Sequence, residues 1–358
     1  MKMLRTIVLL LFLTSTINAM PDSLDMKIGQ MIMVGMKGTT VTPNSKILQH
    51  IRNNIIGGIL LFEFNLNSIS TLQNLESLTS KLKAEAKIPL LIAIDQEGGK
   101  VNRLKQKYGF DEMPSAKSLG DQNDMQSLSK TAQIISTALY KAGINVNFAP
   151  VLDVHNSLCP VLGKLGRCYS SDVEVIAQMA SVLLDSMSQK NIIGVGKHFP
   201  GHGNSRTDSH KSLVDVSNYW DSSELKPYQK LIKNNKLQAV MTGHIINSKL
   251  DKTNKPATLS EEVVTTLLRK KLGFNGVVFS DDMQMHAISS HYGFEQSIKL
   301  AIQAGVDILI FSNNIENATQ YTPENIHQTI KKLVLKGDIS KSQIDESYQR
   351  IQTLKRQL

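Results

Sequence analysis

The sequence has few cysteines and few aromatic residues, and each shortage excludes a class of protein. Only two of the 358 residues are cysteine, which excludes a small domain stapled by several disulfides. Aromatic residues make up 5% of the chain, too few for a platform on which nucleic-acid bases stack. The formal net charge is +9, but the basic residues are spread along the chain and form no block of five or six. We therefore expect no nucleic-acid partner.

The rest of the composition is that of an ordinary globular protein. Hydrophobic residues make up 41% of the chain and charged residues 20%, fractions that exclude a disordered protein, a collagen and a coiled coil. A chain of this length suits one (β/α)8 barrel, which typically needs about 250 residues plus insertions. No Pro-rich or Gly/Ser-rich linker marks a second domain.

The N-terminal segment 1–19, MKMLRTIVLLLFLTSTINA, is organised like an export signal. Lys2 and Arg5 provide a basic start, and the apolar run Ile7–Leu13 is too short for a spanning helix of roughly 20 residues. There is no cysteine near the expected cleavage point, so the sequence does not indicate a lipid anchor. We predict a signal peptide over 1–19, a mature catalytic domain over 20–358 that is periplasmic or secreted, and no stable membrane insertion after cleavage. The alternative is a buried first helix or strand.

The two cysteines, Cys159 and Cys168, flank a short segment, CPVLGKLGRC. An oxidising compartment would permit a bridge between them, and two reduced thiols fit the sequence equally well. A zinc site is less favoured because no second cysteine pair or nearby histidine completes it.

Short apolar runs bounded by Gly, Pro, Asn or Asp alternate with helical patterns along the chain. The eight expected strands are 30–34, 58–62, 90–94, 145–148, 192–196, 239–242, 276–279 and 307–311. The clearest expected helices are 70–87, 125–142, 173–189 and 259–272, with two more over 324–358. Eight strands favour a closed barrel over an open sheet. We predict an α/β fold, a single (β/α)8 TIM barrel with long βα loops and C-terminal helices.

Polar side chains follow the third to seventh expected strands, at the points where these strands end. They are Asp95, Glu97 and Arg103, then Asp153, then Lys197, His198, His202, Asp208 and His210, then His244, and finally Asp281 and Asp282. Polar groups at the C-terminal ends of barrel strands are typical of an active site. Five strand ends that converge on one rim therefore predict one site.

These residue types suit the cleavage of a glycosidic bond. Its oxocarbenium-like transition state needs an anion on one face of the sugar and an acid at the leaving oxygen. Asp281 can supply the anion. His210 can supply the acid, with Asp208 to orient it, because an imidazole with a pKa of about 6.5 exchanges protons near neutrality.

Five segments together resemble the NagZ-type β-N-acetylglucosaminidases of glycoside hydrolase family 3. They are IDQEGGKVNRL, NFAPVLDV, GKHFPGHGNSRTDSH, VMTGHI and GFNGVVFSDDMQM. The resemblance runs in order from about residue 26 to about 312 and implies a single TIM barrel. It also implies retention of anomeric configuration, removal of terminal β-linked N-acetylglucosamine from peptidoglycan (muropeptide) fragments, and no metal or cofactor. We expect a monomer whose partner is this saccharide.

The resemblance also implies a role for each matching residue. Asp281 corresponds to the nucleophile, His210 to the acid/base and Asp208 to its partner. The sugar-binding positions correspond to Asp95, Arg103, Arg167, Lys197 and His198. Two features depart from the family: Lys100 stands where arginine is more common, and the export signal leaves a muropeptide and a chitin fragment both open as substrates.

Other readings of these residues remain open. Asp281 could cap a helix, although Asp282 is the better candidate for that role. His198, His202, His210, His244 and Asp281 could form a metal shell, but Pro200-Gly201 breaks any helix that would align the first two. A sugar-binding protein without catalysis and a β-N-acetylglucosaminide phosphorylase are further alternatives. The phosphorylase is an alternative because a histidine acts as the acid/base, and a neutral imidazole, unlike a carboxylate, does not repel phosphate.

Overall fold

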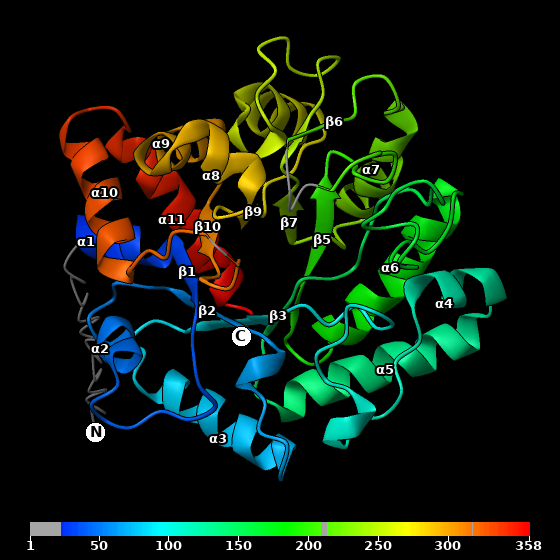
Figure 1. Cartoon of the computed structure of the whole chain (residues 1–358), viewed down its shortest axis with the longest axis horizontal. Coiled ribbons are helices and arrows are strands. Elements are labelled where there is room, and N and C mark those ends of the chain that lie inside the picture. The colour runs from blue at the N-terminus through cyan, green and yellow to red at the C-terminus, as the bar shows by residue number, and fades with distance from the viewer. Residues whose placement is uncertain (1–22, 209–212, 317) are drawn as a thin grey trace, which may run out of the picture.

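Eight parallel strands close into a barrel in the computed structural model, which describes residues 23–208, 213–316 and 318–358 (Figure 1). Consecutive barrel strands lie side by side, and the last strand pairs with the first. The strands are β1 (Ile32–Gly35), β2 (Gly58–Leu61), β3 (Leu91–Ile94), β4 (Val146–Asn147), β5 (Ile193–Phe199), β7 (Ala239–Thr242), β9 (Val277–Asp282) and β10 (Ile308–Phe311). All eight expected strands are present, so the prediction of a (β/α)8 barrel is confirmed.

Helices surround the barrel and follow its strands (Figure 1). They are α1 (Leu24–Gln30), α2 (Lys46–Arg52), α3 (Thr71–Ala84), α4 (Ala116–Gln122), α5 (Met125–Lys141), α6 (Val173–Ser188), α7 (Lys226–Lys233), α8 (His286–Tyr292), α9 (Phe294–Ala304), α10 (Pro323–Leu335) and α11 (Lys341–Lys355). A π-helical segment, Glu262–Lys271, occupies the helix expected over 259–272. The two expected C-terminal helices are α10 and α11.

Side-chain caps explain where several of these helices begin. Asp124 accepts hydrogen bonds from the backbone of Gln126 and Ser127 at the start of α5. Ser340 and Gln343 form a capping box at the start of α11. Such caps satisfy N–H groups that have no partner within the helix, and each contributes about 1 kcal/mol.

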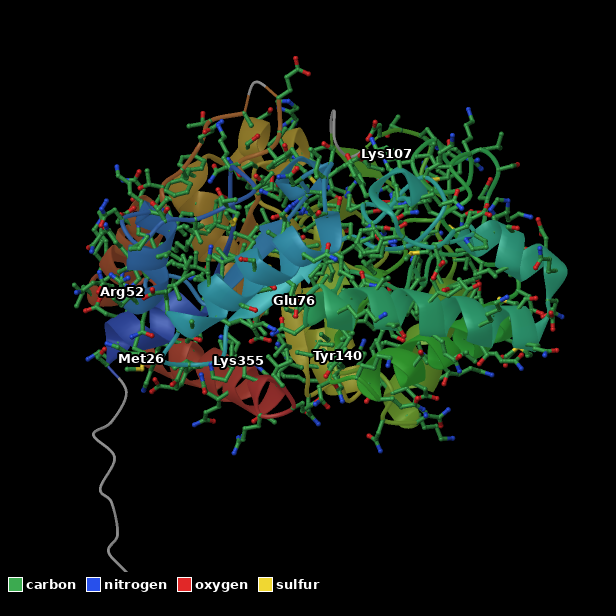
Figure 2. All side chains as sticks on the ribbon, turned by 90° about the horizontal axis from the view of Figure 1, so that it is seen from below. Met26, Arg52, Glu76, Lys107, Tyr140 and Lys355 are labelled. Atoms are coloured by element: carbon green, nitrogen blue, oxygen red, sulfur yellow. The ribbon has the colours of Figure 1, made fainter. Side chains whose placement is uncertain are left out.

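The last helix closes the chain against its beginning. The helices α10 and α11 both pack against α1, which precedes the first strand. Figure 2 shows α11 along one side of the molecule, where Lys355 is labelled, with Glu76 on α3 nearby in that view. A two-stranded parallel ribbon, β6 (Val214–Asp215) with β8 (Ile245–Ile246), lies outside the barrel.

The strand β5 carries two of the predicted site residues, Lys197 and His198, near its C-terminal end. All seven of its residues are buried, including the polar Lys197 and His198 near its C-terminal end. Burying an unpaired charge is costly, so these side chains require partners inside the barrel. The predicted signal peptide over 1–19 lies outside the described residues. In the described part of the chain, no helix is long and apolar enough to span a bilayer.

Candidate active site

A cavity of about 520 Å³ opens at the C-terminal ends of the barrel strands. Seven of the eight predicted site residues line it: Asp95, Arg103, Arg167, Lys197, His198, Asp208 and Asp281. The eighth, His210, lies outside the described residues. Apolar side chains complete the walls, among them Phe62, Phe148, Leu162, Leu165, Met241 and Ile315. The residues from the separate strand ends therefore share one hollow, as the sequence predicts.

Two cations and two carboxylates form a network on one side of this cavity. The Nζ atom of Lys197 lies 2.7 Å from Asp95 Oδ1 and 2.7 Å from Glu97 Oε1. Arg167 donates to both oxygens of Glu97, at 2.8 Å from Nε and 2.7 Å from Nη2. Its Nη1 also donates to the carbonyl of Val161 at 3.0 Å. Glu97 thus fixes the orientation of both buried cations.

The charges in this network determine its protonation. Burial would raise the pKa of Glu97, but Arg167 and Lys197 outweigh it and lower that pKa to about 2. Burial would likewise lower the pKa of Lys197, and Asp95 with Glu97 raises it instead. Near neutral pH Glu97 is therefore ionised and the side chains of Lys197 and Arg167 stay positively charged.

Asp153 anchors the turn that follows β5. Its Oδ2 lies 2.6 Å from His198 Nδ1, and its Oδ1 accepts from the backbone of His202 at 2.7 Å. Burial would raise the pKa of Asp153, but His198 outweighs it and the pKa is lowered. The contact between Nδ1 of His198 and this carboxylate fixes the orientation of a ring that lines the cavity.

The last two residues of β9, Asp281 and Asp282, both line the cavity. Asp281 Oδ1 accepts a hydrogen bond from the backbone of Asp282 at 2.8 Å. The carboxyl group of Asp282 bonds to the hydroxyl of Ser312 and to the backbone of Gln284. Burial raises the pKa of Asp282 to about 6. Neither aspartate caps a helix, because both end β9 and α8 begins only at His286, so the helix-cap reading is wrong for both.

The remaining histidines of the expected rim differ in position. His202 lines the cavity, and burial followed by the charge of His198 lowers its pKa to about 4, so it is neutral at pH 7. His244 is fully buried. Its Nε2 lies 2.9 Å from the carbonyl oxygen of Asp282 and its Nδ1 lies 2.8 Å from Thr258 Oγ1. His244 therefore links the backbone at the end of β9 to the side chain of Thr258.

His210, one residue of the possible metal site, lies outside the described residues, whereas both cysteines of the possible disulfide lie within them. Among the described residues, no group of three or more His, Cys, Asp or Glu side chains is arranged to hold a metal ion. Cys159 and Cys168 are both buried and free. The Sγ atom of Cys159 lies 3.1 Å from Ser205 Oγ, on the segment that leads to Asp208.

Sequence reasoning missed the part played by two residues after β3. Glu97 is named above only as one of the polar residues at the rim and is given no role, yet it bonds both buried cations of the site. Gln96 is fully buried, and its Oε1 accepts from the backbone of Arg103 and Leu104. The signal available in the sequence was the position of Glu97, two residues after Asp95, at a rim where the buried Lys197 and Arg167 both need a carboxylate partner.

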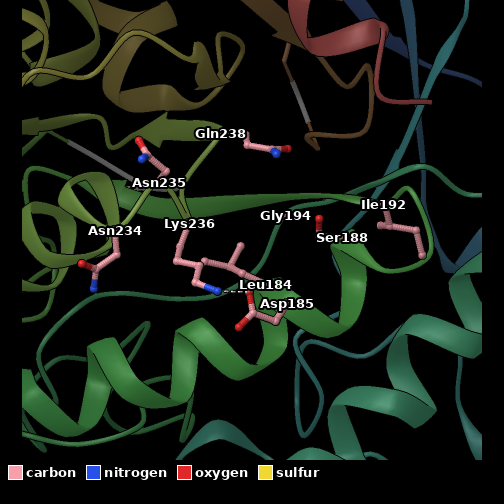
Figure 3. Close-up of a pocket in the computed structure, with 9 residues that line it drawn as sticks. All are labelled: Leu184, Asp185, Ser188, Ile192, Gly194, Asn234, Asn235, Lys236 and Gln238. Carbon is pink, nitrogen blue, oxygen red and sulfur yellow. Dashed lines mark hydrogen bonds and ion pairs between the residues drawn. The ribbon is translucent and has the colours of Figure 1, made fainter.

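A second hollow lies at the other end of the strands (Figure 3). It is about 230 Å³ in volume and is lined by residues near the start of β5 and β7 and the ends of α6 and α7. An ion pair between Lys236 and Asp185 crosses it at 2.6 Å. None of the predicted site residues lines this hollow, so it is separate from the cavity described above.

The chain is similar to known glycoside hydrolases over most of its length. The family model described as "Glycosyl hydrolase family 3 N terminal domain" matches residues 23–354. A beta-hexosaminidase of Nitrosomonas eutropha is 33% identical over 298 residues, which cover 81% of this chain and 82% of that protein. A beta-hexosaminidase of Bordetella avium is 31% identical over 345 residues, which cover 91% and 95%.

Solved structures show the same likeness. The glycoside hydrolase family 3 beta-N-acetylglucosaminidase from Paenibacillus sp. str. FPU-7 matches with a TM-score of 0.85 and 33% identity, over 94% of this chain but only 63% of that one. The beta-N-acetylhexosaminidase from Beutenbergia cavernae matches with a TM-score of 0.81 and 29% identity, over 94% and 99%. With a family model that covers nearly all the described residues and relatives above 30% identity over most of their length, this chain belongs to glycoside hydrolase family 3 and is a glycoside hydrolase.

Proposed function

We propose that this enzyme is a retaining exo-β-N-acetylglucosaminidase that releases terminal β-linked N-acetylglucosamine. The observation that carries the proposal is the position of Asp281 at the end of β9, in a cavity that Asp208 also lines. The names of the relatives above, beta-hexosaminidase and beta-N-acetylglucosaminidase, support the choice of sugar. A retaining mechanism needs a carboxylate close enough to the sugar to form a covalent intermediate.

The proposed reaction is a double displacement. Asp281 attacks the anomeric carbon while His210 protonates the leaving oxygen, and the covalent glycosyl-enzyme forms. His210 then takes a proton from water, which attacks the same carbon and frees the carboxylate of Asp281. Asp208 orients His210 in both steps and stabilises its charged form.

The side chains around Asp281 are suited to gripping a neutral sugar. Arg103 lines the cavity, and its buried Nε atom has no hydrogen-bond partner, so a sugar oxygen would satisfy it. Lys197 and Arg167 are already fixed by carboxylates and lose little freedom on binding. Together with Asp95 and His198, they are the proposed contacts for hydroxyl and acetamido groups.

The natural substrate and the compartment form part of the proposal. A peptidoglycan fragment and a chitin fragment both offer a non-reducing N-acetylglucosamine, and we propose the peptidoglycan fragment because it is the substrate that the resemblance to NagZ-type enzymes implies. We propose export after removal of residues 1–19 because that segment has the organisation of a signal peptide, and we propose that the exported enzyme is a monomer. The reaction requires no cofactor, since both proton transfer and nucleophilic attack are assigned to side chains.

Hydrolysis of 4-nitrophenyl N-acetyl-β-glucosaminide tests the proposal directly. We expect turnover that survives EDTA in the wild-type enzyme and falls by at least about a thousandfold in Asp281→Asn, because the variant has no nucleophile. Turnover lost to EDTA would point to a metal-dependent reaction. Equal turnover in the wild type and the variant would remove Asp281 from its role.

The acid/base role of His210 has its own test. We expect His210→Ala to lose far more activity on a substrate with a poor leaving group than on one with a 2,4-dinitrophenyl group, because a good leaving group departs without protonation. Added azide should restore turnover on the activated substrate by attacking the glycosyl-enzyme. His291→Ala is the matched control, since His291 is exposed on α8. Equal losses on both substrates would contradict the assignment.

A further inference from the structure

Glu224 is a buried carboxylic acid that the proposed mechanism does not use. It lies in the 3₁₀ turn Ser222–Leu225, just before α7, and only 1% of its surface is exposed. The segment 200–208, which follows β5 and ends at Asp208, packs against this turn. Trp220, two residues before the turn, donates from Nε1 to the carbonyl of Pro200 at 3.0 Å.

Asn204 connects Glu224 to this segment. Glu224 Oε1 accepts a hydrogen bond from Asn204 Nδ2 at 2.8 Å. Asn204 Oδ1 in turn accepts from Asn156 Nδ2 at 2.7 Å, on the loop that follows β4. Asn204 precedes Asp208 by four residues, so the amide that Glu224 holds lies close in the chain to the residue that enters the cavity.

The backbone of the segment also lies directly on the carboxyl group of Glu224. Gly201 has a φ of +121°, and a Cβ atom built on it would lie 2.7 Å from Glu224 Oε2. Glu224 Oε2 itself has no hydrogen-bond partner. Because residue 201 has no side chain, the turn and the carboxyl group of Glu224 lie in direct contact.

The surroundings make this carboxyl group titrate near neutrality. Burial raises the pKa of Glu224 to about 7, and the buried charge of Asp153 adds to the rise. The hydrogen bond from Asn204 opposes it most, and the backbones of Asp221 and Gly203 oppose it further. The other titratable group that faces Glu224 is the buried hydroxyl of Tyr228 on α7, whose pKa burial also raises. An ionised carboxylate accepts the Asn204 bond more strongly than the neutral acid does.

We infer that Glu224 is a positioning residue of this enzyme, whose carboxylate acts through Asn204 to hold the segment that brings Asp208 to the cavity. The inference rests on the proposed function, in which Asp208 orients the acid/base His210. Ionisation of Glu224 strengthens its hydrogen bond with Asn204. Asp208 is therefore held in place more firmly when Glu224 is charged than when it is neutral. Activity thereby depends on the charge of a group that touches no substrate.

The test compares pH profiles of kcat/KM for the wild type and Glu224→Gln on 4-nitrophenyl N-acetyl-β-glucosaminide. Glutamine has the shape of the protonated acid and cannot ionise. We expect the wild-type-to-variant ratio to be near one at about pH 5.5 and to rise to about ten at about pH 8, the gain from a charge-assisted over a neutral hydrogen bond. The loss should appear in kcat rather than KM. Glu76→Gln, a change of an exposed glutamate on α3, should give a ratio of one throughout (Figure 2).

Thermal unfolding separates positioning from a merely structural role. The native pKa of Glu224, about 7, lies above the ordinary value of 4.5. The stability that protonated Glu224 contributes is therefore lost as pH rises from about 4.5 through about 7. Glu224→Gln avoids this loss, so its Tm at about pH 8 should equal or exceed that of the wild type while its activity is lower. A structural role predicts the reverse, a lower Tm at every pH.

Each outcome decides something. A flat wild-type-to-variant ratio in an active wild type overturns the inference alone. No turnover by the wild type removes the proposed function and this inference with it. If Glu224→Gln does not fold, Asn204→Ala tests the same bond from its other end, and it should show the same rise of the ratio with pH. An Asn204→Ala profile parallel to that of the wild type would also overturn the inference.

Discussion

Glu97 and Glu63 are two carboxylates with the same lowered pKa in different surroundings. Lysine or arginine neighbours lower the pKa of each to about 2, but the Glu97 side chain is 4% exposed and the Glu63 side chain is 28% exposed. Glu63 pairs with Lys105 and Lys107 at the surface, where an ion pair contributes less than about 1 kcal/mol. The removal of a buried partner costs about 3–5 kcal/mol, because the remaining charge stays uncompensated.

We therefore expect Glu97→Gln to lower the free energy of unfolding by about 3–5 kcal/mol and Glu63→Gln by less than about 1 kcal/mol. Urea unfolding at neutral pH measures both. Because the native pKa of Glu97 lies below its ordinary value of 4.5, its contribution is complete above about pH 4.5 and disappears as pH falls toward about 2. Equal losses in the two variants would contradict the distinction between buried and exposed pairs.

At the same scale, the sequence predicted which side chains reach the cavity but not how they are held. Strand ends identify Asp95, Lys197 and Asp281 because the C-terminal ends of parallel strands meet at one rim. The bonds of Glu97 and Gln96 depend on how a loop folds back after β3, and no periodic pattern encodes that path. Residues that contact substrate were therefore easier to predict than those that orient them.

At the scale of elements, the turn after β5 is fixed by close contact between two loops. A Cβ atom on Gly203 would lie 2.0 Å from the carbonyl oxygen of Val154, so any larger residue must separate the turn from the loop after β4. We expect Gly203→Ala to lower kcat by about a hundredfold, because a displacement of about 1 Å in the segment that leads to Asp208 is costly for catalysis. Steady-state kinetics measures it, with Tm as the check on folding. Normal kcat in a folded variant would show that the segment tolerates this displacement.

The strands and helices were predicted well, and the reason is physical. Buried parallel strands read as short continuous apolar runs, so 58–62 and 307–311 stand out without any structure. Polar residues that extend a strand do not stand out in this way. The sequence predicted that the strand β9 ends at residue 279, whereas it continues through Asp282. The short ribbon of β6 and β8 was missed because two residues carry no period.

At the scale of the whole molecule, a buried lysine of the last helix bonds to residues next to the first strands of the barrel. Lys355 of α11 donates from Nζ to Gln30 Oε1 at 2.6 Å and to the carbonyl of Gly57 at 3.0 Å (Figure 2). Burial lowers its pKa to about 7. These two bonds connect the C-terminal helix to the end of α1 and to the start of β2, elements from opposite ends of the sequence.

The lowered pKa of Lys355 makes the free energy of unfolding depend on pH between about pH 7 and pH 10.5. Between about pH 7 and pH 10.5 the unfolded chain binds the Lys355 proton more readily than the native chain does, so stability rises with pH there. We expect the urea midpoint of the wild type, relative to Lys355→Met, to increase from about pH 7.5 to about pH 9.5. Lys341→Met, which alters an exposed lysine at the start of the same helix, should leave the wild-type dependence intact. If wild type and Lys355→Met change in parallel over that range, Lys355 keeps its proton in the native state and the two bonds hold an ammonium group at every pH tested.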